Sequence, residues 1–354
     1  MDVNKQELNS EQTIEGLVEL SDKEIERYSV KPNDLFFTRT SETSDEIGLT
    51  SAYIGNSIKC VFSGFLLRAR PKVDLNSLFF AYYLRTPKQR NNIIKFSSIT
   101  TRALISGGNL SKMKINFPSI DEQNKIANLF VIIDKKVKLL EKKYQEYQDF
   151  KKYLMQQIFA QKLRFDFKDE WKIVQLKDIA FVPKKTKLTN IDGLKLLTVK
   201  LHTKGIEIND KIKPKLTKRG RPYYIREYGE LLIGRQNFHN GGMGIVPKSL
   251  DGGICSNAIS SFRVFEDKID INYLYYFLAR PEYYIKSERL IGGTGQKEFS
   301  EKELLKLKIE LPSIEEQSKI VDLLRTMDNK INICEIQLNR TQEFKKGLLQ
   351  QMFV

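Results

Sequence analysis

The chain contains one stretch twice: residues 118–123 read PSIDEQ, and residues 312–317 read PSIEEQ. The likeness continues to FKKYLMQQIF at residues 150–159 and FKKGLLQQMF at residues 344–353, always 194 residues apart and without a gap. Roughly 19 of the 43 positions from residue 117 onward are identical. Such an internal repeat predicts a protein built from two equivalent halves.

Each copy of the repeat has the pattern of a long helix. Ser119 with Glu122, and Ser313 with Glu316, predict a capping box, in which the serine hydroxyl and the glutamate carboxylate each accept a backbone N–H bond. Apolar and aromatic residues then recur with a heptad period, which is typical of a coiled coil. The residues predicted to form its seam are Ile126, Phe130, Ile133, Val137, Leu140 and Tyr144 in the first copy, and Ile320, Leu324, Met327, Ile331, Leu338 and Leu348 in the second.

The length of these helices limits how their apolar stripes can be buried. About 40 helical residues at 1.5 Å each make a rod of roughly 60 Å, which cannot bury its stripe against itself. We therefore expect the two copies to pack against each other, antiparallel, within one chain. The alternative is an ordinary amphipathic helix in each of two cores, although helices of this length rarely fit a compact domain. Lys151 and Lys345 interrupt the stripe at matching positions, where we expect the seam to open or a partner to cover it.

The composition indicates a globular, basic protein. With 354 residues there is room for two or three domains, and 41% apolar with 29% charged residues is a globular balance. The net charge of +15 favours a polyanionic partner, most simply nucleic acid, and an inert basic surface is the alternative. Cys60, Cys255 and Cys334 have neither metal-ligand nor disulfide spacing, which favours a reducing cytoplasm. We find no signal peptide and no membrane-spanning run, so neither export nor insertion is expected.

Two variable regions of similar pattern precede the two copies. In residues 1–116 and at their border we expect strands at residues 16–20, 34–38, 59–62, 65–68 and 110–117, and helices at residues 75–84 and 88–96. Asp74 is the expected cap of the first of these helices. Residues 164–310 repeat the pattern, with segments 228–235, 269–276 and 304–311 corresponding to 32–39, 73–80 and 110–117.

The two regions differ at their start. The second opens with WKIVQLKDI at residues 171–179, which we expect to begin as a strand, and the first has no counterpart to it. Aligning Gly16 with Gly205 leaves the first region short by about 20 residues or more. We therefore expect a first domain that lacks its opening strand.

Taken together, these motifs resemble the specificity subunit of type I restriction-modification systems, over essentially the whole chain. The resemblance rests on the duplicated P-S-I-[DE]-E-Q entry, the F-K-K-x-L-x-Q-Q-[IM]-F exit and the W-x-x-x-x-L-x-D-I opening at Trp171. It implies an α+β fold with pseudo-twofold symmetry. Two mixed target-recognition domains, residues 1–116 and 164–310, would be separated by two long helices, residues 117–163 and 311–354, that form an intramolecular antiparallel coiled coil.

The resemblance also implies a function and a set of partners. Each target-recognition domain would read one half of a bipartite site in double-stranded DNA, while the coiled coil would set the spacing and dock two methyltransferase subunits. The assembly would methylate adenine, and restriction subunits would add cleavage. The specificity subunit itself would catalyse nothing and hold no cofactor, because S-adenosylmethionine, and ATP with Mg, would bind to the partner subunits. It would work in the cytoplasm.

The residues themselves give no sign of catalysis. The chain has no phosphate-binding G-x-x-x-x-G-K-[ST] loop, no G-x-G-x-x-G after a strand and no N-P-P-[FY] motif. Its two histidines, His202 and His239, do not have the spacing of a metal site. Three rival interpretations stay open: a stand-alone DNA-modifying enzyme, a scaffold that does not bind DNA, and a partial or silent specificity-subunit copy with an impaired first domain.

Three kinds of segment are candidates for contacts with DNA. A basic stretch, residues 211–226, would meet phosphates. A turn after a central strand, residues 235–242, would read bases, because Arg can bond guanine and Asn or Gln adenine, and its glycines would let the backbone approach DNA. The third is the loop before the last strand of each domain, where Arg102 stands opposite Gln296. Unlike side chains at equivalent positions are what two unlike half-sites require.

The candidate residues of the first domain are Arg39, Thr40, Ser41, Thr101 and Arg102, and those of the second are Lys218, Arg219, Arg221, Arg235, Gln236, Asn237, Asn240, Thr294, Gln296 and Lys297. The alternatives are a solvated charged surface for the basic stretch and a plain turn for residues 235–242. A lysine-rich face of the first long helix could also follow the DNA backbone, although solvation is favoured there: Lys135, Lys136, Lys138, Lys142 and Lys143.

Overall fold

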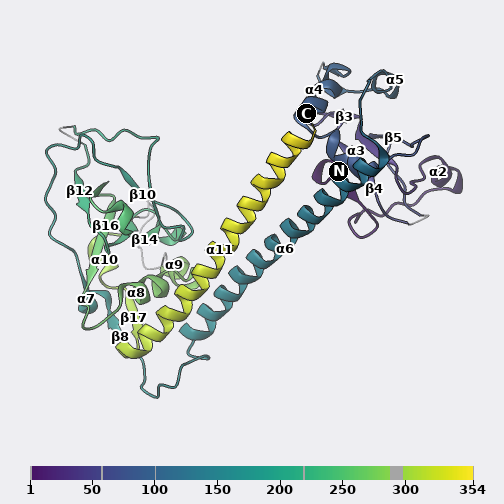
Figure 1. Ribbon diagram of the computed structural model, residues 1–354. Coiled ribbons are helices and arrows are strands. Elements are labelled where there is room, and N and C mark those ends of the chain that lie inside the picture. Colours follow the sequence, from purple (N-terminus) through teal and green to yellow (C-terminus); the bar gives the residue numbers. More distant parts are fainter. Residues whose placement is uncertain (1, 57–58, 100, 218–219, 288–297, 354) are drawn as a thin grey trace. The chain divides into compact units, whose positions relative to one another are not determined.

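The chain folds into two compact units that share two long helices (Figure 1). The computed structural model describes residues 2–56, 59–99, 101–217, 220–287 and 298–353. Unit 1 comprises Met1–Lys143 and Cys334–Val354, and unit 2 comprises Tyr144–Ile333. The helices α6 (Ile120–Phe159) and α11 (Ile314–Met352) each give one part to unit 1 and the other to unit 2. The predicted α+β fold with two long helices is confirmed.

Unit 1 contains a four-stranded sheet of order β1-β4-β2-β5. The central strand β2 (Leu35–Thr38) is antiparallel to β4 (Thr50–Tyr53) and β5 (Leu66–Ala69), and β1 (Leu8–Asn9) is parallel to β4. All four residues of β2 are buried, because the strand is covered on both faces. A smaller sheet joins β3 (Thr40–Ser41), β7 (Ala103–Leu104) and β6 (Ser98–Ile99).

Short helices complete unit 1: α1 (Asp2–Lys5), α2 (Asp22–Arg27), α3 (Ser77–Tyr83), α4 (Pro87–Lys95) and α5 (Gly107–Leu110). Phe79 of α3 lies in one core cluster with Phe130 of α6, and both contact Phe353, just after α11. The rings of Phe130 and Phe353 stack with centroids 5.7 Å apart. Burying a side chain of this kind is worth roughly 1.5 to 3 kcal/mol, so this cluster anchors both long helices in unit 1.

Unit 2 repeats the centre of the larger sheet. The strand β13 (Leu231–Gly234) is antiparallel to β14 (Met243–Ile245) and β16 (Ile259–Val264), and β9 (Ala180–Phe181) pairs antiparallel with β16 at the edge of the sheet. Further pairs are β10 (Leu197–Val199) with β11 (Ile206–Ile208), β12 (Tyr223–Arg226) with β15 (Gly253–Ser256), and β17 (Lys308–Leu311) with β8 (Lys172–Gln175). Its short helices are α7 (Leu176–Ile179), α8 (Ile271–Leu278), α9 (Pro281–Ser287), α10 (Glu301–Leu304), η1 (Phe238–Asn240) and η2 (Lys248–Leu250).

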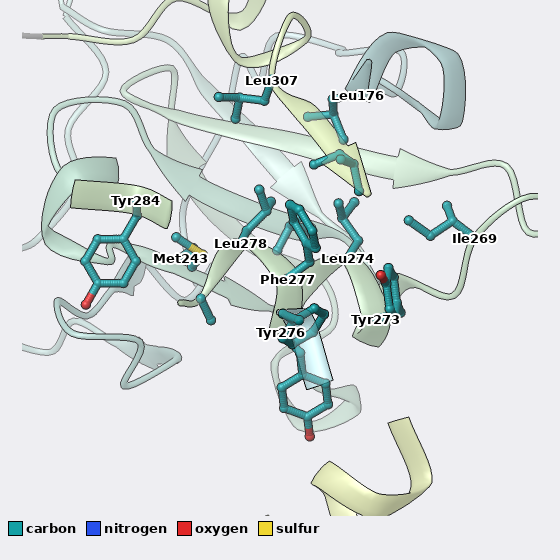
Figure 2. Close-up of a cluster of buried hydrophobic side chains, with 14 of the residues drawn as sticks. Leu176, Met243, Ile269, Tyr273, Leu274, Tyr276, Phe277, Leu278, Tyr284 and Leu307 are labelled. Atoms are coloured by element: carbon teal, nitrogen blue, oxygen red, sulfur yellow. The ribbon is translucent and has the colours of Figure 1, made fainter. Parts of the chain in front are cut away.

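The core of unit 2 lies around α8. Leu274 and Phe277 of this helix are buried in one cluster with Leu176 and Leu307, which come from opposite ends of the unit's sequence (Figure 2). The hydroxyl of Tyr276 points away from the cluster (Figure 2). Because α8 is apolar on most of its surface, it is buried almost all round, as expected of a central helix.

The two units correspond in detail, but with a shift that the sequence pattern did not predict. The backbone amides of Asn76 and Asp270, which cap α3 and α8, both donate to a glutamine of a long helix, at 3.0 and 2.9 Å. These two caps are 194 residues apart. The expected correspondence of residues 269–276 to 73–80 is therefore wrong by two positions, and so is Asp74 as the cap.

Two expected strands of unit 1 do not form. Residues 16–20 have no strand partner among the described residues, and the side chain of Leu17 is 98% exposed. In residues 59–62, only Val61 makes a bridge, to Ser29. A short β-propensity segment gains little unless it has both a neighbouring strand and a core face. Residues 16–20 have neither, whereas residues 59–62 pack Cys60 and Phe62 against a core cluster but pair only through the bridge of Val61.

The strand expected at residues 110–117 does not form either. Its counterpart in unit 2, β17, is a strand because it pairs along its whole length with β8, from Lys308 opposite Gln175 to Leu311 opposite Lys172. The strand β8 lies in the opening segment that has no counterpart in the first domain. Since strand pairing is what defines the element, residues 110–117 remain without strand structure.

The lysines that interrupt the seam do not open it. In unit 2, Lys151 of α6 forms an ion pair with Asp328 of α11, the Tyr276 hydroxyl donates to Asp328 (2.6 Å), and the ammonium lies 5.2 Å from the Tyr276 ring centroid. Unit 1 repeats this triad with Lys345, Asp134 and Tyr82. Each lysine is paired by the other helix, so the expectation of an open or partner-covered seam is wrong.

The capping box expected at the start of α11 forms only in part. The Ser313 hydroxyl accepts a bond from the Glu316 amide (3.3 Å). The Glu316 carboxylate, however, accepts two bonds from Arg164 (3.0 and 2.7 Å) and one from the Trp171 indole (3.1 Å). Glu316 is buried, and a bidentate arginine pair satisfies its charge better than a single backbone amide would.

Candidate nucleic-acid interface

In unit 1 the smaller sheet brings the two predicted DNA-contact segments together. The strand β3, which contains Thr40 and Ser41, pairs with β7, and Thr101 and Arg102 come directly before β7. Arg39 comes directly before β3 and is exposed. Segments that are 60 residues apart in the sequence thus form one polar group in the smaller sheet of unit 1, with Arg102 beside Glu42 at one end of the strand pair and Arg39 beside Ile105 at the other.

The accessibility of this group suits a contact with DNA. The Arg102 guanidinium is 3.9 Å from the Glu42 carboxylate, and both side chains are largely exposed. Such an exposed pair is worth at most about 1 kcal/mol, so a phosphate or a base can replace Glu42. Ser41 is buried and donates to Glu46 (3.0 Å), which makes it part of the support of the group.

Arg235 follows β13 in unit 2 as Arg39 follows β2 in unit 1. Its guanidinium Nε lies 3.1 Å from the Glu298 carboxylate and donates to the Phe299 carbonyl (3.0 Å), while Nη1 donates to the Asn257 carbonyl (3.3 Å). Arg235 therefore ties the chain around Phe299 to the end of β13, and its side chain is half-buried.

The amide side chains of the same turn differ in exposure. Asn237 is exposed, whereas Gln236 and Asn240 are half-buried. The Asn240 amide nitrogen is 3.1 Å from Nε2 of His239. Asn237 is therefore the side chain of this turn that a base edge can reach most easily.

The glycines of this turn serve its own packing. Gly241 has a φ of +68°, and a Cβ there would lie 3.2 Å from the backbone nitrogen of Thr203. A Cβ on Gly242 would lie 2.8 Å from the Asn237 carbonyl oxygen. Both glycines are buried, so the expectation that they let the backbone approach DNA is wrong.

The basic stretch is mostly exposed, with one exception. Arg226 is 1% exposed and donates to the Ile259 carbonyl (3.0 Å), so the prediction that the whole stretch meets phosphates is wrong for this residue. The exposed basic residues of the stretch that the structure describes are Lys211, Lys213, Lys215 and Arg221. The candidates Lys218, Arg219, Thr294, Gln296 and Lys297 lie outside the described residues.

The predicted seam residues of α6 and α11 are all buried or half-buried. In unit 1, Asp134 of α6 pairs with Lys345 of α11 (2.6 Å), and the Cys334 thiol of α11 lies 3.5 Å from the Leu140 carbonyl oxygen of α6. The lysines of the outer face of α6, Lys135, Lys136, Lys138, Lys142 and Lys143, are exposed. Residue numbers rise on α6 as they fall on α11, so the two segments in unit 1 run antiparallel.

Both long helices also carry exposed apolar residues that the heptad pattern did not identify. Leu139 and Phe344 are exposed in unit 1, and Phe150 and Ile333 in unit 2. Leu139 is equivalent to Ile333 in the repeat, and Phe150 is equivalent to Phe344. Along each helix the two residues are 11 positions apart, close to three turns, so they share one face.

The tyrosines of the two triads were also missed by sequence reasoning. Burial, together with the hydrogen bond to Asp134, raises the pKa of Tyr82 far above its ordinary value, and burial with Asp328 does the same for Tyr276. Each phenol therefore stays a proton donor to its carboxylate. The spacing of 194 residues between Tyr82 and Tyr276 is the sequence signal that could have found them.

Two features are absent from the described residues. None of the helices there is both long enough and apolar enough to cross a membrane. No three His, Cys, Asp or Glu side chains in the same part of the chain gather where they could hold a metal ion.

Comparisons with known proteins give a consistent result. Residues 5–148 and 168–341 match the family model described as type I restriction modification DNA specificity domain. The type I restriction enzyme MjaVIII specificity subunit of Methanocaldococcus jannaschii is 22% identical over 359 residues, which span 94% of this chain and 80% of that protein. The MjaX specificity subunit of the same organism is 25% identical over 361 residues, with 94% and 81% coverage.

A solved structure has a similar fold. The S subunit of a type I restriction-modification system from M. genitalium aligns with a TM-score of 0.59 at 17% identity. The alignment covers 100% of this chain and 90% of that one. At this identity the likeness concerns the fold alone.

Proposed function

The chain belongs to the type I restriction-modification DNA specificity domain family, and we propose that it reads a bipartite DNA site, one half with each target-recognition domain. The observation that carries this proposal is the pair of equivalent arginines, Arg39 and Arg235. Each arginine follows the central strand of its unit. The backbone carbonyl of Arg39 accepts a bond from the backbone amide of Ile105, and that of Arg235 accepts one from the equivalent Phe299, both at 3.0 Å. Two frames of the same design therefore hold loops of different sequence.

The loops supply the difference between the half-sites. In unit 1 the loop before Ile105 carries Arg102, whose side chain is free to exchange Glu42 for DNA. Its equivalent position in unit 2 is Gln296. Arginine favours guanine and glutamine favours adenine in the major groove, so the two domains would prefer different bases.

Methyltransferase subunits are the partners that we assign to the long helices. Leu139, Phe150, Ile333 and Phe344 expose apolar surface at two repeated positions, and exposed apolar stripes on helices are typical docking surfaces. Two methyltransferase subunits, one for each repeat, would be placed alike on both halves. S-adenosylmethionine would bind to these partners, and ATP with Mg to restriction subunits if the system has them. The assembly would act in the cytoplasm, with its cysteines reduced.

DNA binding by the assembled complex tests this proposal. We expect affinity for duplex DNA to fall steeply with salt, because basic side chains displace counterions from phosphates. The Arg102→Ala variant should lose sequence preference, and the neighbouring exposed Glu42→Ala variant should not. Absent or salt-insensitive binding would contradict the proposal and favour a scaffold that does not bind DNA.

A further inference from the structure

In unit 2 the tip of the hairpin formed by β10 and β11 is bonded to the turn of residues 235–242. The backbone amide of His202 donates to the Asn240 carbonyl, and the amide of Thr203 donates to the Gly241 carbonyl, both at 2.8 Å. Two successive backbone bonds leave the turn little freedom to move away from the tip.

The same turn contains Asn237, whose side chain is exposed. Its backbone carbonyl accepts bonds from the amides of Asn240 (3.0 Å) and Gly242 (2.8 Å). Asn240 therefore bonds to Asn237 through its amide and to His202 through its carbonyl. The side chain of the turn that a base edge reaches most easily is thus connected to the hairpin tip through the backbone.

The tip itself has an unfavourable backbone conformation. His202 has a φ of +57° and Thr203 a φ of +56°, in the left-handed region that favours glycine. This conformation is costly for a residue with a Cβ, above all for a β-branched residue such as threonine. It persists only where surrounding contacts impose it, so the tip depends on support from the rest of the unit.

Tyr275 of α8 gives such support. Its hydroxyl donates to the Thr203 carbonyl at 3.1 Å. Its neighbours Leu274 and Tyr276 are buried in the core, so the helix is a fixed base for this bond. Burial, together with the charge of Asp328, raises the pKa of Tyr275 to about 12, so the phenol keeps its proton at neutral pH.

This support is particular to unit 2. The equivalent of Tyr275, 194 residues earlier, is Ala81, which is buried and has no hydroxyl. The adjacent Tyr276 does have an equivalent, Tyr82, and both bond to an aspartate of a long helix. Adjacent tyrosines of α8 therefore have different tasks: Tyr276 serves a contact that both units share, and Tyr275 serves the hairpin of unit 2.

We propose that Tyr275 is a positioning residue for base recognition by unit 2. It holds the hairpin tip, the tip holds the turn of residues 235–242, and the turn sets where the side chain of Asn237 meets a base. This inference rests on the proposed function, because it requires that the turn contacts DNA. An asparagine amide bonds adenine through two atoms at once, so a small shift of the turn weakens base discrimination more than it weakens phosphate binding.

Selection from a pool of DNA duplexes with randomised sequence tests the inference on the full chain, assembled with methyltransferase partners. We expect Tyr275→Phe, which removes only the hydroxyl, to reduce the preference at one position of the second half-site about fivefold, as for the loss of one neutral hydrogen bond. Asn237→Ala should reduce the preference at that same position, and the double variant should lose no more than Asn237→Ala alone. The first half-site should be unchanged in all of them.

Tyr283→Phe is the matched control. Tyr283 is also half-buried in unit 2, and its hydroxyl also donates to a backbone carbonyl, that of Lys308 (2.7 Å). It should keep the preferences of the wild type in both half-sites. An equal effect of Tyr283→Phe and Tyr275→Phe would overturn the inference, because general loosening of unit 2 would then explain both.

The remaining outcomes separate this inference from the proposed function. A wild-type selection without a bipartite preference would overturn both. A bipartite wild type with an unchanged second half-site in Tyr275→Phe would overturn this inference alone. So would an effect of Tyr275→Phe on both half-sites, or on a position that Asn237→Ala leaves unchanged.

Discussion

At the scale of residues, the duplicated lysine, aspartate and tyrosine triad explains how a polar position is accommodated in an apolar seam. The lysine of one long helix and the aspartate of the other meet beside a buried tyrosine in each unit. A polar contact in a helix interface selects one register, because a shift of either helix would leave buried polar groups without partners. We infer that the triads specify the register of α6 against α11 within each unit.

Removing the aspartate should therefore destabilise the fold. We expect Asp328→Ala to lower the free energy of unfolding by about 1 to 2 kcal/mol, because the Tyr276 hydroxyl and Lys151 both lose their partner and Asp328 is itself half-exposed. Urea denaturation measures this change. Asp322→Ala, an exposed carboxylate on the same helix, is the control, and an equal loss in both variants would disprove a special role of the triad.

A second residue-scale prediction concerns acid. Burial alone would raise the pKa of the Glu7 carboxyl. The positive charges of Lys345 and Arg85 lower this pKa by more than burial raises it, so the net pKa lies below 4.5. A lowered carboxyl pKa stabilises the fold above the ordinary value, and this stability is lost as the pH falls through the folded-state pKa. The urea concentration at the unfolding midpoint should therefore decrease when the pH is lowered below 4.5, and it should decrease less in the Glu7→Gln variant than in the wild type. Identical pH profiles for both proteins would contradict this assignment.

At the scale of elements, the sequence predicted those structures that local periodicity determines. Both long helices follow from a heptad pattern that is legible within each copy of the repeat. The failures concern elements that depend on distant partners. The strand expected at residues 110–117 did not form because unit 1 has no described strand that pairs with it as β8 pairs with β17. Residues 16–20 have no strand partner among the described residues. A strand is stabilised by its neighbours, which a single segment of sequence does not reveal.

The candidate site was predictable to a similar extent. The sequence identified Arg39 and Arg102 as candidates, and the structure brings their segments together through β3 and β7. It did not reveal that Arg226 is buried or that Gly242 packs against its own turn, because both facts depend on how the chain folds back. Basic composition therefore indicates a class of partner more safely than it indicates a contact residue.

The exposed apolar positions of the long helices give an element-scale prediction. We expect Leu139→Glu to weaken assembly with methyltransferase subunits by about tenfold or more, because a buried leucine is worth about 1.5 to 3 kcal/mol. Sedimentation of the mixed subunits measures this. Lys138→Glu, a charge change at the adjacent exposed position, should assemble normally, and circular dichroism should be unchanged in both. Normal assembly of Leu139→Glu would remove this face from the docking surface.

At the scale of the whole molecule, the chain consists of two units of one design that differ in their loops. Each unit has a central buried strand, an arginine at its end, a short capped helix and parts of both long helices. A duplicated frame with unlike loops is the arrangement that two-part recognition of an asymmetric DNA site requires. Around these shared parts the sheets of the two units differ, and the described part of unit 1 has no strand that corresponds to β8.

Mapping of methylated adenines in a host that carries this chain and its methyltransferase partners tests the central claim most directly. We predict a bipartite motif in the wild type. Arg102→Ala should relax one half and Gln296→Ala the other, each by the roughly 1 to 3 kcal/mol that a base contact supplies, with the spacing unchanged. A motif without two separate halves, or a single variant that alters both halves, would contradict the account.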